Sequence, residues 1–196
     1  MDARIRSGRL LTGADLDIES VHKDKNGRLW FGDEFGPFLV KTDAAGKVLR
    51  SEVALPGVML PQNPFLGGAT PNLGASRCCE GMAINAAGDT LYTLLEGTVT
   101  GDPAKSLRIN AFDVDSKQFG AKSWLYHLEN DRTNIGDMTA LNDHTYPATG
   151  GRNLGSDNTE FLKIHLAAAV PEPQTWAPML AGFGVMASVE RRRHGL

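Results

Sequence analysis

Three acidic residues near the start of this chain have the spacing expected of metal ligands on one strand. Asp15, Asp17 and Glu19 alternate with Leu16 and Ile18. Side chains of a β-strand point to opposite faces in turn, so a strand here would gather the carboxylates on one face and send the aliphatic side chains into the core. Clustered negative charges repel one another unless a cation lies between them, and calcium, which takes several oxygen ligands in irregular geometry, is the leading candidate. A solvent-facing acidic edge that discourages aggregation is the alternative.

Further acidic residues occupy matching places in two similar stretches of the chain and are predicted to join the same calcium site: Asp33, Glu34, Glu80 and Glu96. Glu80 follows Glu19 at the interval, about sixty residues, that also separates Gly27 from Gly88. Glu34 and Glu96 stand beside apolar residues that we expect to be buried, and a buried carboxylate needs a partner. A third, weaker copy of the stretch spans residues 136–143.

Each copy is predicted to fold as a strand, a tight turn and a second strand. Asn26-Gly27 is a strong hairpin signal because both central turn positions need positive φ. The residues after the turns, 29–31 and 91–94, have the aromatic or β-branched character of strands, and further hairpin strands are predicted at 38–41 and 108–112. Residues 1–165 show no sustained helical period. The sequence therefore predicts an all-β protein of repeated antiparallel sheets, as in a β-propeller.

The predicted propeller domain, residues 1–166, has room for about three to four blades of the usual 40 to 45 residues. A closed ring needs at least about four blades, so we expect an incomplete ring. Such a ring leaves strand edges unpaired, which predicts association or poor solubility.

Composition argues against a nucleic-acid binder. The chain has 196 residues and a formal net charge of −3, whereas binding to phosphate backbones requires a basic surface. Cys78 and Cys79 are adjacent and belong to no zinc-binding pattern, and neighbouring cysteines do not easily meet disulfide geometry. We expect no zinc site and no disulfide.

The chain resembles the bacterial phytase-like domain, also called esterase-like activity of phytase, over roughly residues 10 to 166. The matching strings, of which Asp-Glu-Phe-Gly-Pro is fairly specific, lie at residues 13–21, 30–38, 80–83 and 91–97. The resemblance implies a secreted β-propeller that acts as a calcium-dependent phosphoesterase or esterase. All seven acidic residues would then be calcium ligands, and Arg77 or Lys23 would contact the phosphate of a small anionic or ester substrate.

Two stretches depart from this family. Cys78-Cys79 stand where members usually carry a glycine and an aromatic residue, and residues 145–153 replace an aliphatic strand that ends in Glu-Arg-Asp. The second departure predicts the loss of a strand and of two site carboxylates, so activity is in doubt.

Two other functions remain open. In a serine esterase Ser76 would be the nucleophile, although Gly74-Ala75-Ser76-Arg77-Cys78 is one glycine short of the usual elbow. A non-catalytic binding module of the cell envelope or surface, stabilised by calcium, is the alternative to both enzymes.

The end of the chain resembles a PEP-CTERM sorting tail, which an exosortase-type enzyme processes. A proline-containing linker spans 167–175, and residues 176–196 contain a short apolar run followed by three arginines. The run is shorter than the roughly 20 residues that span a bilayer, but Trp176 and the arginines could anchor residues 176–193 at a membrane as a short helix. An amphipathic helix packed on the domain is the alternative.

The tail predicts export to the envelope or the medium. Residues 1–8 contain no apolar region of a signal peptide. Either export uses another route or this chain is a fragment whose true beginning is missing, and we favour the fragment.

Overall fold

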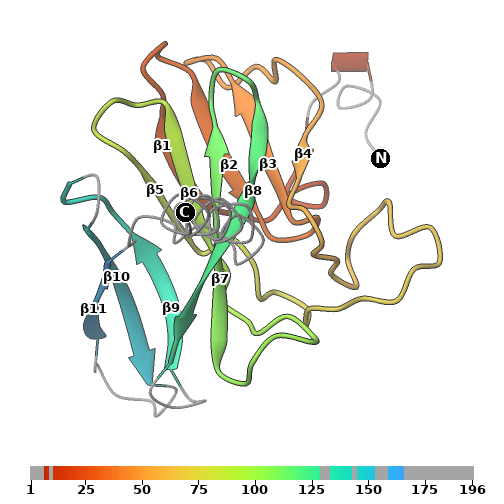
Figure 1. Cartoon of the computed structure of the whole chain (residues 1–196). Coiled ribbons are helices and arrows are strands. Elements are labelled where there is room, and N and C mark those ends of the chain that lie inside the picture. Colours follow the sequence, from red (N-terminus) through yellow and green to blue (C-terminus); the bar gives the residue numbers. More distant parts are fainter. Residues whose placement is uncertain (1–6, 9–10, 129–132, 143–144, 153–158, 166–196) are drawn as a thin grey trace, which may run out of the picture. The chain divides into compact units, whose positions relative to one another are not determined.

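Three antiparallel sheets make up the described part of the chain (Figure 1). The structure is a computed structural model that describes residues 7–8, 11–128, 133–142, 145–152 and 159–165. Contacts between Cα atoms divide the chain into one unit of residues 1–166 and another of residues 167–196. The predicted linker and apolar helix lie outside the described residues. No helix within those residues is long and apolar enough to cross a membrane.

The first sheet is a meander of strands in chain order: β1 (Ile18–Lys23), β2 (Leu29–Asp33), β3 (Phe38–Thr42) and β4 (Val53–Ala54). Gly27 has φ of 74° in the turn between β1 and β2, as the Asn-Gly signal predicts. The carboxylate of Asp24 accepts hydrogen bonds from the backbone N–H groups of Asn26 and Arg28, which closes the turn.

The second sheet repeats this plan: β5 (Gly81–Ile84), β6 (Thr90–Leu94), β7 (Ser106–Asp113) and β8 (Gln118–His127). Gly88 has φ of 71°, and the side-chain oxygen of Asn85 accepts hydrogen bonds from the N–H groups of Asp89 and Thr90. Asn85 thus closes its turn as Asp24 does in the first sheet. The predicted repeat of strand, turn and strand is confirmed.

The third sheet has three described strands, in the order β11 (Thr159–His165), β10 (Thr145–Arg152) and β9 (Thr133–Met138). The predicted loss of a strand at residues 145–153 is therefore wrong. Pro147 lies within the central strand β10, where it cannot donate to the ladder, but its carbonyl still accepts the N–H of Thr139 at 3.0 Å. Residues on both sides of Pro147 continue the pairing with β11, so one missing donor does not prevent the strand.

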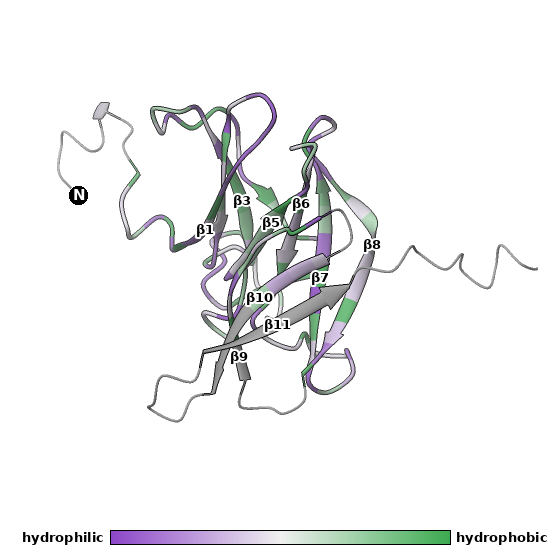
Figure 2. Cartoon of the chain, turned by 90° about the vertical axis from the view of Figure 1, so that its left-hand side faces the viewer, coloured by the Kyte–Doolittle hydropathy of each residue, from purple (hydrophilic) through white to green (hydrophobic). Residues whose placement is uncertain are grey.

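The apolar core lies between successive sheets, because β5 contacts both β1 and β9. Trp30 of β2 and Phe112 of β7 meet with ring centroids 4.8 Å apart, in a cluster that joins the first and second sheets. Leu94 of β6 packs with Tyr146 of β10 in a cluster that joins the second and third sheets. Figure 2 shows apolar residues along strands such as β3. The second sheet is thus buried on both faces, and this packing fixes where its strand ends lie relative to the first sheet.

Candidate metal centre

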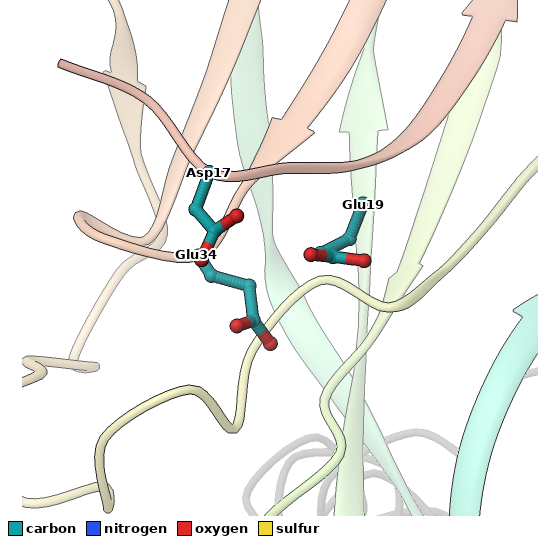
Figure 3. Close-up of side chains that lie close together, drawn as sticks. All are labelled: Asp17, Glu19 and Glu34. Atoms are coloured by element: carbon teal, nitrogen blue, oxygen red, sulfur yellow. The ribbon is translucent and has the colours of Figure 1, made fainter. Parts of the chain in front are cut away.

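Five of the seven predicted acidic ligands meet at one end of the first two sheets. Carboxylate oxygens of Asp17, Glu19 and Glu34 lie within 4.8 Å of one another, as do those of Glu34, Glu80 and Glu96. Figure 3 shows the first group, with Asp17 and Glu19 on one segment and Glu34 on the next. Glu34 belongs to both groups, so the five side chains form one continuous site, which we call the carboxylate cluster.

The antiparallel strand order explains this convergence within each sheet. Ile18 at the start of β1 pairs with Asp33 at the end of β2, so the residues around them lie at the same edge. The N–H of Glu34 donates to the carbonyl of Asp17 at 2.8 Å. In the second sheet Gly81 pairs with Leu94, which likewise brings the segments that carry Glu80 and Glu96 to one edge.

Contacts between β1 and the segment that enters β5 bring the two edges together. The hydroxyl of Ser20 donates to the carbonyl of Cys79 at 2.8 Å, and Nε2 of His22 donates to the carbonyl of Met82 at 2.6 Å. Gly32 of β2 faces the same contact, since a Cβ there would lie 3.0 Å from the Cβ of Cys79. The carboxylates of both sheets therefore converge because the backbones that carry them are packed tightly.

Glu34 is the centre of the carboxylate cluster. Its side chain is only 3% exposed, and its Oε1 has no hydrogen-bond partner within the described part of the chain. A buried carboxylate oxygen without a partner carries a large desolvation penalty. A bound cation is the simplest partner that would offset this penalty.

Burial and mutual repulsion raise the pKa of three glutamates in the cluster. Burial, followed by the charge of Glu96, raises the pKa of Glu80 to about 7. Burial is also the main cause that raises the pKa of Glu34 and of Glu96, and the charge of Glu19 acts in the same direction on both. In the absence of a cation these groups therefore hold protons more tightly than free glutamates do.

Asp33 lies outside the cluster, contrary to the sequence prediction. Its side chain is buried, and it accepts hydrogen bonds from the N–H groups of Asp17 at 2.8 Å and Gly36 at 3.1 Å. Asp33 thus holds the backbone that positions its neighbour Glu34. Its role is to shape the loop.

Asp15 also lies outside the cluster, because the predicted strand begins only at Ile18. Residues 13–15 form a turn, and the exposed carboxylate of Asp15 accepts hydrogen bonds from the N–H and hydroxyl of Thr12, both at 2.8 Å. These bonds lower the pKa of Asp15. Ile18 is 42% exposed, so the predicted inward orientation of this aliphatic residue is wrong as well.

The two predicted phosphate contacts occupy different places. Arg77 is exposed beside the cluster: its carbonyl accepts the N–H of Glu96, and its charge opposes the rise in that residue's pKa. Lys23 is at the far end of β1 from Glu19, a separation of roughly 13 Å at the usual rise of a strand. Of these two residues, Arg77 is the one that lies beside the cluster.

The donor set suits a hard cation. Every candidate ligand atom in the two groups is a carboxylate oxygen, and no histidine or cysteine among the described residues joins them. Calcium and magnesium prefer oxygen, and calcium tolerates irregular arrangements of several carboxylates. Each member was predicted from the sequence, Asp17 from its alternation with aliphatic residues and the four glutamates from the repeat, whereas the exclusion of Asp15 and Asp33 was not.

The family model described as phytase-like, esterase-like activity of phytase, matches residues 3–172 of this chain. The search of curated proteins found no match to this chain. Similar solved structures include virginiamycin B lyase from Staphylococcus aureus, with a TM-score of 0.40 and 14% identity over 83% of this chain and 44% of that chain. The β-propeller domain of Cps50 (Swd1) from Myceliophteria thermophila has a TM-score of 0.39 and 12% identity over 80% of this chain and 41% of that chain. A streptogramin B lyase has a TM-score of 0.35 and 13% identity over 80% of this chain and 57% of that chain. The chain thus spans between 41% and 57% of the length of these three structures.

Proposed function

The chain belongs to the phytase-like family, and on this premise we propose that it is part of an exported β-propeller that hydrolyses phosphate esters with the help of calcium. The observation that carries the proposal is the carboxylate cluster around the unpartnered, buried oxygen of Glu34. At this cluster a bound cation would offset the negative charge that the carboxylates otherwise present to an anionic substrate.

Five side chains would hold the cation: Asp17, Glu19, Glu34, Glu80 and Glu96. A bound calcium ion supplies Lewis acidity toward a phosphoryl oxygen. The partly buried Glu80, whose pKa is about 7 without metal, would release its proton near neutral pH when it binds the cation. The guanidinium of Arg77, exposed beside Glu96, can bind a phosphate oxygen pair, and this contact would orient the ester.

A calcium-stabilised binding module without catalysis is the second candidate. It is favoured by the fact that the cluster draws Glu34 from the first sheet and Glu80 from the second. A cation there would hold the two sheets together, whether or not a substrate is turned over. This reading keeps the same metal site but predicts stabilisation without hydrolysis.

A serine esterase receives less support from the geometry. Ser76 has φ of 47° and an exposed side chain, and the ring of His22 is engaged with the carbonyl of Met82. His22, one candidate base, is thus oriented toward Met82.

Export and membrane contact are the remaining parts of the proposal. They rest on residues 167–196, whose proline pair, apolar run and terminal arginines suit processing by an exosortase-type enzyme and contact of residues 176–193 with a membrane. Fractionation of cells that express the full chain or a chain ending at residue 166 tests this part. Equal distribution of both chains would argue against a sorting role.

The metal site is tested by calcium titration of the metal-free full chain in a calorimeter. Glu34→Gln should weaken calcium binding by at least about tenfold, since it removes the shared ligand. Asp15→Asn is the matched control, because it removes one carboxylate from the same region but outside the cluster. Equal effects of the two substitutions would refute the assignment.

Turnover is tested with p-nitrophenyl phosphate, phytate and p-nitrophenyl acetate, each with calcium and with a chelator. Calcium-dependent release of phosphate that Glu34→Gln abolishes supports the phosphoesterase. Calcium binding and a raised melting temperature without turnover of any ester would support the binding module.

A further inference from the structure

A basic pocket lies at the other end of the first sheet, and we propose that it binds a small ligand that carries two or more phosphate groups. The pocket is open, has a volume of about 500 Å³, and is lined by four cationic residues with one apolar and one hydroxyl neighbour: Arg28, Lys41, Arg50, Lys117, Leu49 and Ser51. The proposal goes beyond the hydrolase function and does not rest on it.

The pocket and the carboxylate cluster are separate sites. Arg28 immediately precedes β2, whereas Glu34 follows the other end of that strand, so the two lie roughly 20 Å apart along it. Lys117 comes from the turn between β7 and β8, and Lys41 comes from β3. The pocket therefore joins residues of the first and second sheets, as the carboxylate cluster does at the opposite end.

A buried aspartate compensates one of the four cations. Nζ of Lys41 lies 3.8 Å from Oδ2 of Asp24 and 4.9 Å from the centre of the Trp30 ring. Asp24 is only 3% exposed, and its Oδ2 also accepts a hydrogen bond from Nε1 of Trp30 at 2.9 Å. Burial alone would raise the pKa of Asp24, but hydrogen bonds from Arg28, Trp30 and the Asn26 backbone, together with the charge of Lys41, lower it. The lowered pKa favours the carboxylate form of Asp24, which anchors Lys41 at the wall of the pocket.

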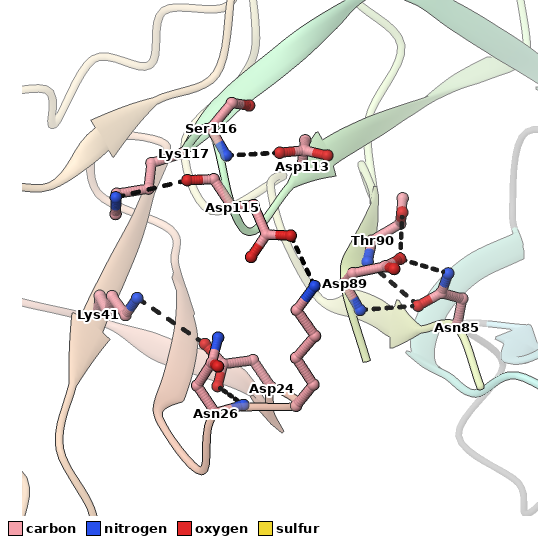
Figure 4. A network of polar contacts seen from close by, with 11 residues as sticks. Asp24, Asn26, Lys41, Asn85, Asp89, Thr90, Asp113, Asp115, Ser116 and Lys117 are labelled. Carbon is pink, nitrogen blue, oxygen red and sulfur yellow. Dashed lines mark hydrogen bonds and ion pairs between the residues drawn. The ribbon is translucent and has the colours of Figure 1, made fainter. Parts of the chain in front are cut away.

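The carboxylate of Asp115, which lies near Lys117 in the sequence, is already engaged. Asp115, two residues before Lys117, forms an ion pair with Lys25 at 2.6 Å. Figure 4 marks this contact of Asp115 with a dashed line, and another dashed line marks the ion pair between Lys41 and Asp24. Nζ of Lys117 reaches only the backbone carbonyl of Asp115, at 3.4 Å. Its positive charge therefore has no carboxylate partner in the described part of the chain.

The two arginines are likewise uncompensated. Nε of Arg50 donates to the carbonyl of Ser51 at 3.2 Å, and the guanidinium of Arg28 makes no hydrogen bond or ion pair with a described residue. Three positive charges around one opening raise the local potential and favour an anion. Both guanidinium groups keep the paired N–H donors that match a phosphate group.

These features define the class of ligand. One phosphate group could satisfy one guanidinium fork, so two arginines with two lysines suit linked phosphate groups. The volume is that of a small-molecule site, and Leu49, which is 42% exposed, offers an apolar patch for the carbon skeleton of an ester. The structure thus assigns to this end of the sheets a binding site for a polyphosphate or a compound with several phosphate groups.

Calorimetric titration of the full chain with sodium tripolyphosphate tests this assignment. The titration is done at low salt in metal-free buffer and is compared with orthophosphate. Arg28→Gln should weaken tripolyphosphate binding by about tenfold, as expected for a lost hydrogen-bonded charge. Lys105→Gln is the matched control: it also removes one exposed cation, but at the far end of β7 from Lys117.

A Glu34→Gln variant separates this proposal from the hydrolase function. Unchanged tripolyphosphate binding in that variant, with a loss in Arg28→Gln and little change in Lys105→Gln, supports the basic pocket even if no turnover or calcium binding is found. Three results would overturn the proposal: no binding by the unmodified chain, orthophosphate binding as tight as that of tripolyphosphate, or equal losses in the Arg28 and Lys105 variants.

Discussion

Removal of metal should make the stability of this protein fall as the pH rises from about 5 to 8. Glu80 has a pKa of about 7 in the folded chain, mainly because of burial, against 4.5 for an ordinary glutamate. The folded state therefore binds the proton more tightly than the unfolded state. The resulting stabilisation is fully present below pH 4.5 and is lost as the pH rises through 7.

The magnitude follows from the two pKa values. A pKa difference of this size corresponds to a change of about 3 kcal/mol in the free energy of unfolding for a fully buried group. Glu80 is only partly buried, so solvent screening reduces the expected change to about 1–2 kcal/mol. For a domain of this size, that amounts to a fall of about 2–8 °C in the melting temperature. The raised pKa values of Glu34 and Glu96 act in the same direction. The lowered pKa of Asp24 affects stability only at more acidic pH, because its contribution is lost as the pH falls.

The assay is thermal unfolding, followed by circular dichroism, at several pH values with a chelator or with calcium. Glu80→Gln should flatten the metal-free profile, since the amide cannot titrate, and calcium should raise the melting temperature more at pH 8 than at pH 5, because metal and protons compete. A metal-free melting temperature that stays constant or rises between pH 5 and 7.5, or an unchanged slope in Glu80→Gln, would refute the reasoning.

Two further predictions concern the turns and the core. Gly88→Ala should destabilise the fold by about 1–3 kcal/mol in urea unfolding, because φ is 71° and the new Cβ would lie 2.9 Å from the backbone nitrogen of Lys25. Gly27→Ala, with φ of 74° and no atom within 4 Å, should cost less, and a larger effect at Gly27 would contradict the steric explanation. Trp30→Phe should cost about 1–3 kcal/mol, since it removes the N–H that bonds to buried Asp24. Because the two residues interact, the effect of Trp30→Phe should be smaller in an Asp24→Asn background. The double-mutant cycle should therefore give a coupling of at least about 0.5 kcal/mol, and a coupling near zero would contradict the interaction.

Local chemistry was enough to predict the strands β2, β3, β6 and β7 and the turns that precede β2 and β6 in the first two sheets. Asn26-Gly27 specified a turn with positive φ, and the apolar residues that follow Gly27 and Gly88 specified the strands β2 and β6. The repeat also identified Glu34 and its counterpart Glu96, because equivalent positions in equivalent sheets lie at the same edge. These features depend on neighbours within a few residues, so they can be read directly from the chain.

Only the tertiary structure decided which acidic side chains converge. Asp15 and Asp33 have the same chemistry as Asp17, yet one closes a turn with Thr12 and the other binds the backbone of Gly36. A carboxylate can satisfy itself with any nearby N–H group, and the choice depends on where the backbone passes. Sequence spacing does not contain that information.

The basic pocket shows the same limit more strongly. Arg28, Lys41, Arg50 and Lys117 are scattered among other charged residues and form no motif. They become neighbours because the second sheet packs on the first, which places the turn between β7 and β8 beside the ends of β2 and β3. The sequence by itself determined the sheets and supplied the charges, while the packing of one sheet against another decided which charges meet, since contacts between distant segments arise only from the burial of apolar faces.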